Sequence, residues 1–214
     1  MEQREREILR YLGYKQKDLP DERTRVLISE TEEELKRVCT PARVFRIFPI
    51  REVTEELVDF GFTSIRSRNL ARNLSGCFEA VFLAATLGSK TEQLLAKYNR
   101  LQVSRAVVLQ ATATQAIEEY CDACEEEIRG QLGAGCYMRP RFSPGYGDFS
   151  LEFQREMLQI LETPKKIGLT LTDSLLMMPS KSVTAVIGIS REVISCSRRG
   201  CEACDRQNCP YRRG

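Results

Sequence analysis

The sequence predicts an α+β fold, in which an antiparallel, twisted sheet is covered by long helices. Residues 104–132 carry apolar side chains at helical spacing over many turns. Residues 182–189 instead alternate in the way that a strand of an antiparallel sheet does. Helical and strand patterns are interspersed without regular βαβ spacing and without a glycine-rich dinucleotide fingerprint. This arrangement favours α+β over a doubly wound parallel sheet.

Two helices are expected in the first 40 residues. Residues 4–12 include the apolar pair Ile8 and Leu9, and Gly13 ends the pattern. A charged amphipathic helix is expected from Asp21 to Val38, with an apolar face toward the core. Its many Glu, Lys and Arg side chains indicate a solvated outer face.

The middle of the chain alternates between short strands and short helices. The apolar run from Cys77 to Leu87, bounded by two glycines, is typical of a buried strand. Val44–Phe48 also has a strand pattern and lies between two prolines. The other elements expected here are a strand at Thr63–Ser67, a helical segment at Asn69–Leu74 and a helix at Lys90–Tyr98.

The longest helix is expected to run from Ser104, which can cap its start, to about Leu132. Gly133 can end it. The apolar stripe that predicts this helix consists of Leu109, Ala113, Ala116, Ile117, Tyr120, Cys121, Cys124 and Ile128.

Two kinds of residue on this helix bear on function. Glu118 lies beside the apolar stripe, whereas Glu125–Glu127 fall mostly away from it. A carboxylate at the border of a buried face is usually half in water. Cys121 and Cys124 lie on the stripe itself, so core packing is a better interpretation for them than a redox pair.

Composition limits the classes of protein to which the chain can belong. Its 214 residues suit one large domain, or one domain with an appendage, and 42% hydrophobic content is enough for a core. The net charge of +2 gives no nucleic-acid footprint. No apolar run could span a membrane and no signal-peptide core is present, so we expect a cytoplasmic protein. Histidine is absent, which excludes histidine bases and ligands from this chain.

The segment Arg141-Phe-Ser-Pro-Gly-Tyr146 combines a turn with two side chains that recognise ligands. Proline presets φ and Gly145 accepts positive φ, so a tight turn is expected. Ser150 can then cap a helix whose inner face carries Phe153, Met157, Leu158 and Leu161. Taken alone, an arginine and a tyrosine beside such a turn are usually surface residues.

The order of motifs along the chain supports a more specific interpretation. The segment Arg141–Tyr146 is followed by a helix and then by Ile167–Ser174, Met177–Pro179 and Ser182–Val183. This series resembles the C-terminal reactivation domain of cobalamin-dependent methionine synthase. The resemblance implies a reactivator on its own chain, which binds S-adenosylmethionine and presents its methyl group to an oxidised cobalamin. Such a chain would be an accessory subunit of methionine synthase, and whether it is itself an enzyme is left open.

The resemblance also implies a set of ligand-binding residues but no catalytic residue. Arg141 would hold the ligand's carboxylate, and Glu118 falls near a family glutamate that contacts S-adenosylmethionine. The backbone around Phe142–Pro144 would follow the edge of the adenosine, and Gly145 would let the backbone approach the ligand closely. Tyr146 would pack against the ligand or form a hydrogen bond with it. Cobalamin would be held by the partner, which is a methionine synthase or another corrinoid protein. An electron donor would also be required.

The spacing of four cysteines in the C-terminal tail predicts a metal site. Cys196, Cys201, Cys204 and Cys209 are separated by four, two and four residues. Four clustered thiols without a secretion signal favour an iron–sulfur cluster or zinc, with redox thiols or disulfides as the alternative. The tail departs from the synthase domain, so we expect a ligand-binding domain at residues 1–190, including the N-terminal helices, and a metal-binding tail at residues 191–214.

Two other functions remain possible at this point. One is an S-adenosylmethionine-dependent methyltransferase that acts on a small molecule, which would need a closed pocket and a general base other than histidine. The other is a metal-binding adaptor protein, in which the cysteine tail docks a partner and the large domain is a scaffold.

Overall fold

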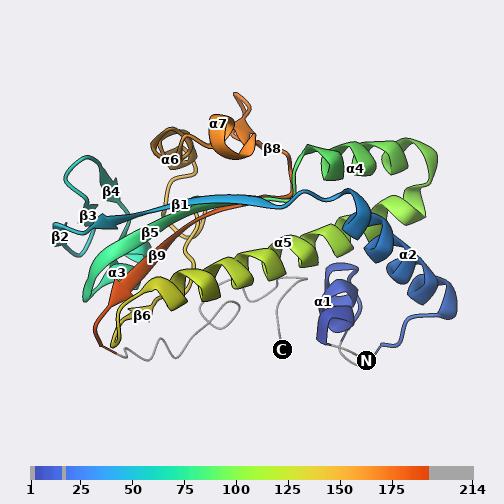
Figure 1. The fold of residues 1–214 in the computed structure, drawn as a ribbon, viewed down its shortest axis with the longest axis horizontal. Helices are drawn as coiled ribbons and strands as arrows, with labels where there is room; N and C mark the ends of the chain where they lie inside the picture. Colours follow the sequence, from blue (N-terminus) through green and yellow to red (C-terminus); the bar gives the residue numbers. More distant parts are fainter. Residues whose placement is uncertain (1–2, 16–17, 193–214) are drawn as a thin grey trace.

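A four-stranded antiparallel sheet forms the centre of the computed structural model, which describes residues 3–15 and 18–192 (Figure 1). Its strands lie in the order β1-β5-β9-β6, so β5 and β9 are the central pair. Their bounds are Ala42–Pro49 for β1, Cys77–Thr86 for β5, Ser182–Ser190 for β9 and Tyr137–Met138 for β6. The predicted α+β class is confirmed.

Helix α5, Val103–Gln131, packs along one face of the sheet. Alternate residues of the central strands, such as Val81 and Ile187, are buried there together with Ile128 of the helix. Three further helices surround α5 (Figure 1), namely α1 at Gln3–Tyr11, α2 at Glu22–Val38 and α4 at Ser89–Leu101. Within the described residues, no helix has the combination of length and apolar character that crossing a membrane requires.

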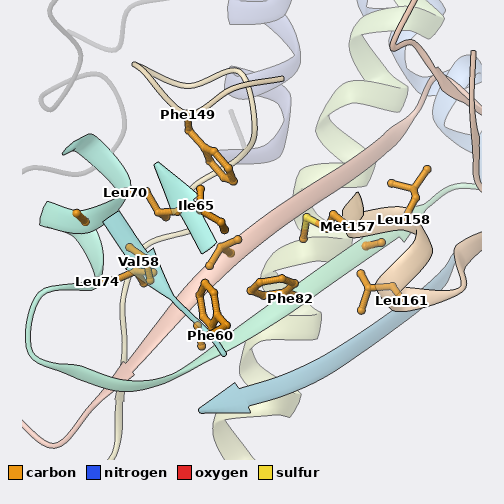
Figure 2. Packing of buried hydrophobic residues seen from close by; sticks show 14 of the residues in the cluster. Val58, Phe60, Ile65, Leu70, Leu74, Phe82, Phe149, Met157, Leu158 and Leu161 are labelled. Atoms are coloured by element: carbon orange, nitrogen blue, oxygen red, sulfur yellow. The ribbon is translucent and has the colours of Figure 1, made fainter. Parts of the chain in front are cut away.

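The opposite face of the sheet is covered by smaller elements. Figure 2 shows Phe82 of β5 on this face, with Phe60 nearby and with Met157, Leu158 and Leu161 packed in the same cluster. Phe82 is fully buried, and its ring lies 5.1 Å from that of Phe60. Truncating it to alanine would cost about 3–5 kcal/mol. The covering elements are a sheet of β2 (Glu52–Val53), β3 (Leu57–Asp59) and β4 (Ser64–Arg66), helices α3 (Arg68–Leu74), α6 (Phe153–Leu161) and α7 (Thr163–Ile167), and a hairpin of β7 (Thr170–Leu171) and β8 (Met177–Met178).

Four local predictions were wrong. Strand β9 was expected to be half-buried, but it is covered on both faces because helices lie on each side of the sheet. Ser104 does not cap α5, which begins at Val103 without a side-chain cap bond. Helix α5 ends at an extended Leu132 rather than at a left-handed glycine. Ser150 does not cap the next helix, whose N-cap residue is Glu152, although its Oγ accepts a hydrogen bond from the Glu152 N–H at 3.3 Å.

The glycine that follows β5 is required by close packing. Gly88 has a φ of 85°, and a Cβ added there would lie 2.3 Å from Thr40 Oγ1. The chain therefore turns from the central strand into α4 directly against Thr40, which lies two residues before β1. Only glycine allows both this backbone conformation and this approach.

Candidate ligand-binding site

The segment that carries Arg141 extends the sheet along the outer edge of β9. The Arg139 N–H donates to the Gly188 carbonyl at 2.8 Å. Phe142 and Val186 exchange two backbone hydrogen bonds, each of 2.9 Å. These bonds fix the backbone on both sides of Arg141, so the position of this residue relative to α5 is set by the sheet.

The predicted Pro-Gly turn follows directly. Gly145 has a φ of 92°, and its N–H donates to the Phe149 carbonyl at 2.8 Å. The Tyr146 N–H donates to the Ser143 carbonyl at 3.1 Å. The rings of Phe142 and Phe149 stack with a centroid distance of 6.2 Å, and Phe149 is buried in the core. The turn is therefore anchored at both ends.

The guanidinium of Arg141 contacts three carboxylates of α5. Its Nη1 lies 2.6 Å from Glu125 Oε1, and its Nη2 lies 3.0 Å from Glu118 Oε2 and 2.9 Å from Asp122 Oδ1. These acidic residues are spaced i, i+4 and i+7, which places them on one face of the helix. Arg141 and these three carboxylates together carry a net charge of −2.

Burial differs within this acidic group. The side chain of Glu125 is 16% exposed, whereas that of Asp122 is 71% exposed. Burial raises the pKa of Glu125, although Arg141 acts in the opposite direction. Burial acts to lower the pKa of Arg141, but the carboxylates of Glu125, Glu118 and Asp122 raise it overall. Glu125 is thus the inner partner of the arginine, and the other two carboxylates lie toward solvent.

Tyr146 stands beside this group at the surface. Its side chain is exposed, and its ring meets that of Phe142 edge to face at a centroid distance of 6.0 Å. Partial desolvation of the hydroxyl raises the pKa of Tyr146, and the negative charge of Glu118 adds to this effect. Tyr146 therefore borders the same charged region.

The structure brings together most of the residues that the sequence suggested. Arg141, Glu118, Gly145 and Tyr146 lie around one region, but both backbone hydrogen-bonding groups of Phe142 are used by Val186. The expected contact between the backbone around Phe142–Pro144 and the ligand stays a prediction.

Two residues of the acidic group around Arg141 were not predicted from the sequence. Asp122 was not considered, and Glu125 was grouped with Glu126 and Glu127, which are exposed as expected. Glu125 instead lies against Arg141. The i, i+4, i+7 spacing of acidic residues from Glu118 was a usable signal in the sequence.

The predicted metal ligands Cys196, Cys201, Cys204 and Cys209 lie outside the described residues. Among the residues that the structure describes, no cluster of three or more His, Cys, Asp or Glu side chains could hold a metal ion. Cys121 and Cys124 are fully buried, which confirms the prediction of core packing. Burial raises the pKa of Cys121 to about 12, so this thiol stays protonated.

The structure is an α+β domain in which an arginine beside the edge of the sheet contacts three carboxylates of α5. The chain belongs to the family of vitamin B12 dependent methionine synthase activation domains, whose model matches residues 78–194, more than half of the chain. No curated protein matches the sequence.

A solved structure supports the fold. The chain is similar to the MetH reactivation domain bound to AdoHcy, with a TM-score of 0.57 and 15% sequence identity. The match covers 78% of this chain and 65% of that chain, which is less than two thirds of the length of the solved protein. At this identity, the similarity concerns the fold.

Proposed function

We propose that the chain binds S-adenosylmethionine beside Arg141 and presents its methyl group to the cobalamin of a methionine synthase or a related corrinoid protein. The observation that carries this proposal is the acidic group around Arg141, in which one guanidinium is surrounded by three carboxylates. Membership of the activation-domain family, and the AdoHcy bound to the similar solved domain, support a ligand of this class.

The charges of the ligand match those of the site. S-adenosylmethionine carries a carboxylate, an ammonium and a sulfonium. Its carboxylate can replace Glu118 or Asp122 at Nη2 of Arg141, while Glu125 keeps hold of Nη1. The released carboxylates can then pair with the ammonium and stand near the sulfonium. Binding therefore exchanges ion pairs inside the protein for ion pairs with the ligand, and no charge is left without a partner.

The work of this chain would be positioning and control of solvent access. The partner's reduced cobalamin supplies the nucleophile that takes the methyl group, and an electron donor must reduce it. Arg141 and Glu118 would fix the amino-acid end of the ligand, and Tyr146 would border it at the surface. The site lies at an edge of the sheet rather than in its interior, as access by a large partner requires.

Calorimetric titration of S-adenosylmethionine tests this proposal, with Arg141→Ala compared with Arg43→Ala. Arg43 is a matched control, because it also pairs with a glutamate of α5 but from the other edge of the sheet. Loss of a charged hydrogen bond costs roughly 1.5–3 kcal/mol, so Arg141→Ala should bind about tenfold to a hundredfold more weakly. Equal affinities in the two variants would remove Arg141 from the site.

The partner is tested by adding a cob(II)alamin-loaded corrinoid protein and a strong reductant. Formation of methylcobalamin that depends on Arg141 is the expected result. Methylation of a small-molecule acceptor without any response from corrinoid proteins would favour a methyltransferase instead. Binding of a partner without S-adenosylmethionine binding would favour an adaptor.

We also propose that the tail binds an iron–sulfur cluster or zinc through Cys196, Cys201, Cys204 and Cys209, separately from the ligand site. Protein purified without oxygen should be brown if it holds a cluster, and colourless with about one zinc per chain if it holds a structural zinc site. Deleting residues 195–214 should remove either signal and leave S-adenosylmethionine binding intact. Absence of both metals in elemental analysis would leave redox thiols as the better account.

A further inference from the structure

The turn that follows Arg141 is also held by helix α3. Asp148 Oδ1 accepts a hydrogen bond from Ser67 Oγ at 2.5 Å and another from the Asn69 N–H at 3.1 Å. Asp148 Oδ2 accepts a hydrogen bond from the Arg68 N–H at 2.8 Å. Arg68 is the first residue of α3 and lies 80 positions before Asp148 in the sequence. One carboxylate of the turn therefore binds the start of a helix from a distant part of the chain.

Two further features bring the turn and α3 together. Gly147 has a φ of 55°, and a Cβ added there would lie 2.6 Å from Asn69 Nδ2. Phe149, which follows Asp148, is buried in the same apolar cluster as Leu70 of α3 (Figure 2). The end of the turn is thus fixed to α3 by hydrogen bonds, by a close backbone approach and by apolar packing.

The carboxylate of Asp148 is committed to these bonds. The hydrogen bond from Ser67 lowers the pKa of Asp148, and the bonds from the N–H groups of Asn69 and Arg68 act in the same direction. The group is therefore ionised near neutral pH. Three of its roughly four lone pairs already accept hydrogen bonds. Asp148 is suited to holding the turn rather than to contacting a ligand.

In the sequence, Tyr146 lies between this attachment and Arg141. The Tyr146 carbonyl accepts from the Phe149 N–H at 2.9 Å, so Tyr146 and Asp148 belong to one tight turn. Desolvation raises the pKa of Tyr146 and the negative charge of Glu118 adds to the shift, which places the hydroxyl near the acidic group. Arg141 itself is fixed by the sheet on both sides. Loss of the attachment at Asp148 should therefore displace Tyr146 and leave Arg141 in place.

We propose that Asp148 is a positioning residue, which ties the turn to α3 and thereby holds Tyr146 in place beside S-adenosylmethionine. This inference rests on the proposed function, because it concerns a residue that borders the same ligand. Helix α3 lies outside residues 78–194, which match the family model. The attachment therefore joins the turn to a part of the chain that the family match does not include.

A fluorescent probe tests the position of Tyr146 without any ligand. The sequence has no tryptophan, so Tyr146→Trp introduces a single fluorophore at the turn. Adding Asp148→Ala should lower the fluorescence anisotropy, because the turn loses its attachment. Asp59→Ala is the matched control, since Asp59 also accepts from a serine hydroxyl and a backbone N–H, but within the β3–β4 hairpin. Unchanged anisotropy with Asp148→Ala, or an equal change with Asp59→Ala, would overturn the proposal.

Calorimetry with S-adenosylmethionine tests the consequence for binding. Asp148→Ala should bind about tenfold more weakly, because a displaced contact group loses much of its effect. Asp59→Ala should match the wild type. When Tyr146→Ala is already present, Asp148→Ala should cause no further loss, because the two residues act through one contact. Wild-type affinity in Asp148→Ala, or additive losses in the double variant, would contradict the positioning role.

Asp148→Asn provides a milder change if the alanine variant does not fold. It keeps the shape of the side chain but loses the charge and one acceptor oxygen, so it should bind about threefold more weakly. Wild-type affinity in this variant would also overturn the proposal. A wild-type protein that does not bind S-adenosylmethionine would instead refute the proposed function. In that case the fluorescence measurement still decides whether Asp148 holds Tyr146.

Discussion

Two arginines reach helix α5 from opposite edges of the sheet, and they meet different amounts of negative charge. Arg43, on the edge strand β1, forms a two-pronged pair with the single carboxylate of Glu127 and also contacts Cys124 Sγ at 3.6 Å. Arg141, beside the outer edge of β9, contacts three carboxylates. The first pair is balanced in charge, whereas the second group has an excess of two negative charges.

The two groups also differ in how their glutamates ionise. The hydrogen bond from Arg43 lowers the pKa of Glu127, which is well solvated. Burial raises the pKa of Glu125 despite the contact with Arg141. A charge-balanced and solvated ion pair, such as Arg43–Glu127, suits a structural contact between a strand and a helix. Crowded and partly buried carboxylates cost stability, and the positive charge of the proposed ligand would offset this cost.

The largest difference between the two groups should be in ligand binding. Glu118→Gln removes a carboxylate that the ligand's ammonium would use, so affinity for S-adenosylmethionine should fall by roughly 1.5–3 kcal/mol. Glu127→Gln is the matched control, because it neutralises a glutamate on the same helix at the balanced pair, and it should leave affinity unchanged. Calorimetric titration of both variants with S-adenosylmethionine measures the two affinities. A similar loss of affinity in Glu118→Gln and Glu127→Gln would show that the acidic group around Arg141 has no special role in ligand binding.

A smaller effect is expected on the choice between S-adenosylmethionine and S-adenosylhomocysteine. The methylated ligand has an additional positive charge on sulfur, which the excess negative charge should favour. Asp122→Asn reduces that excess at an exposed position, so the preference should weaken by at most about 1 kcal/mol. Added salt should weaken it too, because it screens exposed charges. Competitive titrations at low and high salt measure both effects. If neither Asp122→Asn nor salt changes the preference for S-adenosylmethionine, the methyl group is selected by steric fit rather than by charge.

The smallest effect concerns stability against pH, and its sign should differ between the two glutamates. The pKa of Glu125 is raised in the folded state, so its contribution to stability is present below the ordinary value of 4.5 and is lost as pH rises through the raised pKa. The pKa of Glu127 is lowered, so its contribution is present above 4.5 and is lost as pH falls through the lowered pKa.

Urea unfolding of wild type, Glu125→Gln and Glu127→Gln on both sides of this value measures these contributions. As pH rises, wild type should lose stability relative to Glu125→Gln and gain it relative to Glu127→Gln. Parallel curves for the two variants would mean that the two carboxylates lie in equivalent environments.

The elements of this protein could be predicted well where the pattern is local. The apolar stripe of α5, the alternation in β9 and the apolar run of β5 gave their elements to within a few residues. The Pro-Gly turn after Arg141 was equally clear, because its residues impose their own backbone angles. Helix caps were less well predicted, since Ser104 and Gly133 have suitable chemistry at positions where the structure does not use it.

By itself, the sequence determined the longer helices and the central strands, and it placed an arginine next to a rigid turn, because these depend on residues a few positions apart. Only the tertiary structure decided what Arg141 meets. Arg141 and Glu118 are 23 residues apart, and their contact depends on how the edge of β9 lies against α5. The same packing buries both faces of β9 and selects Glu125 rather than its exposed neighbours. Charge pairing and burial are set by the distance between elements in space, and the local pattern of a chain does not specify that distance.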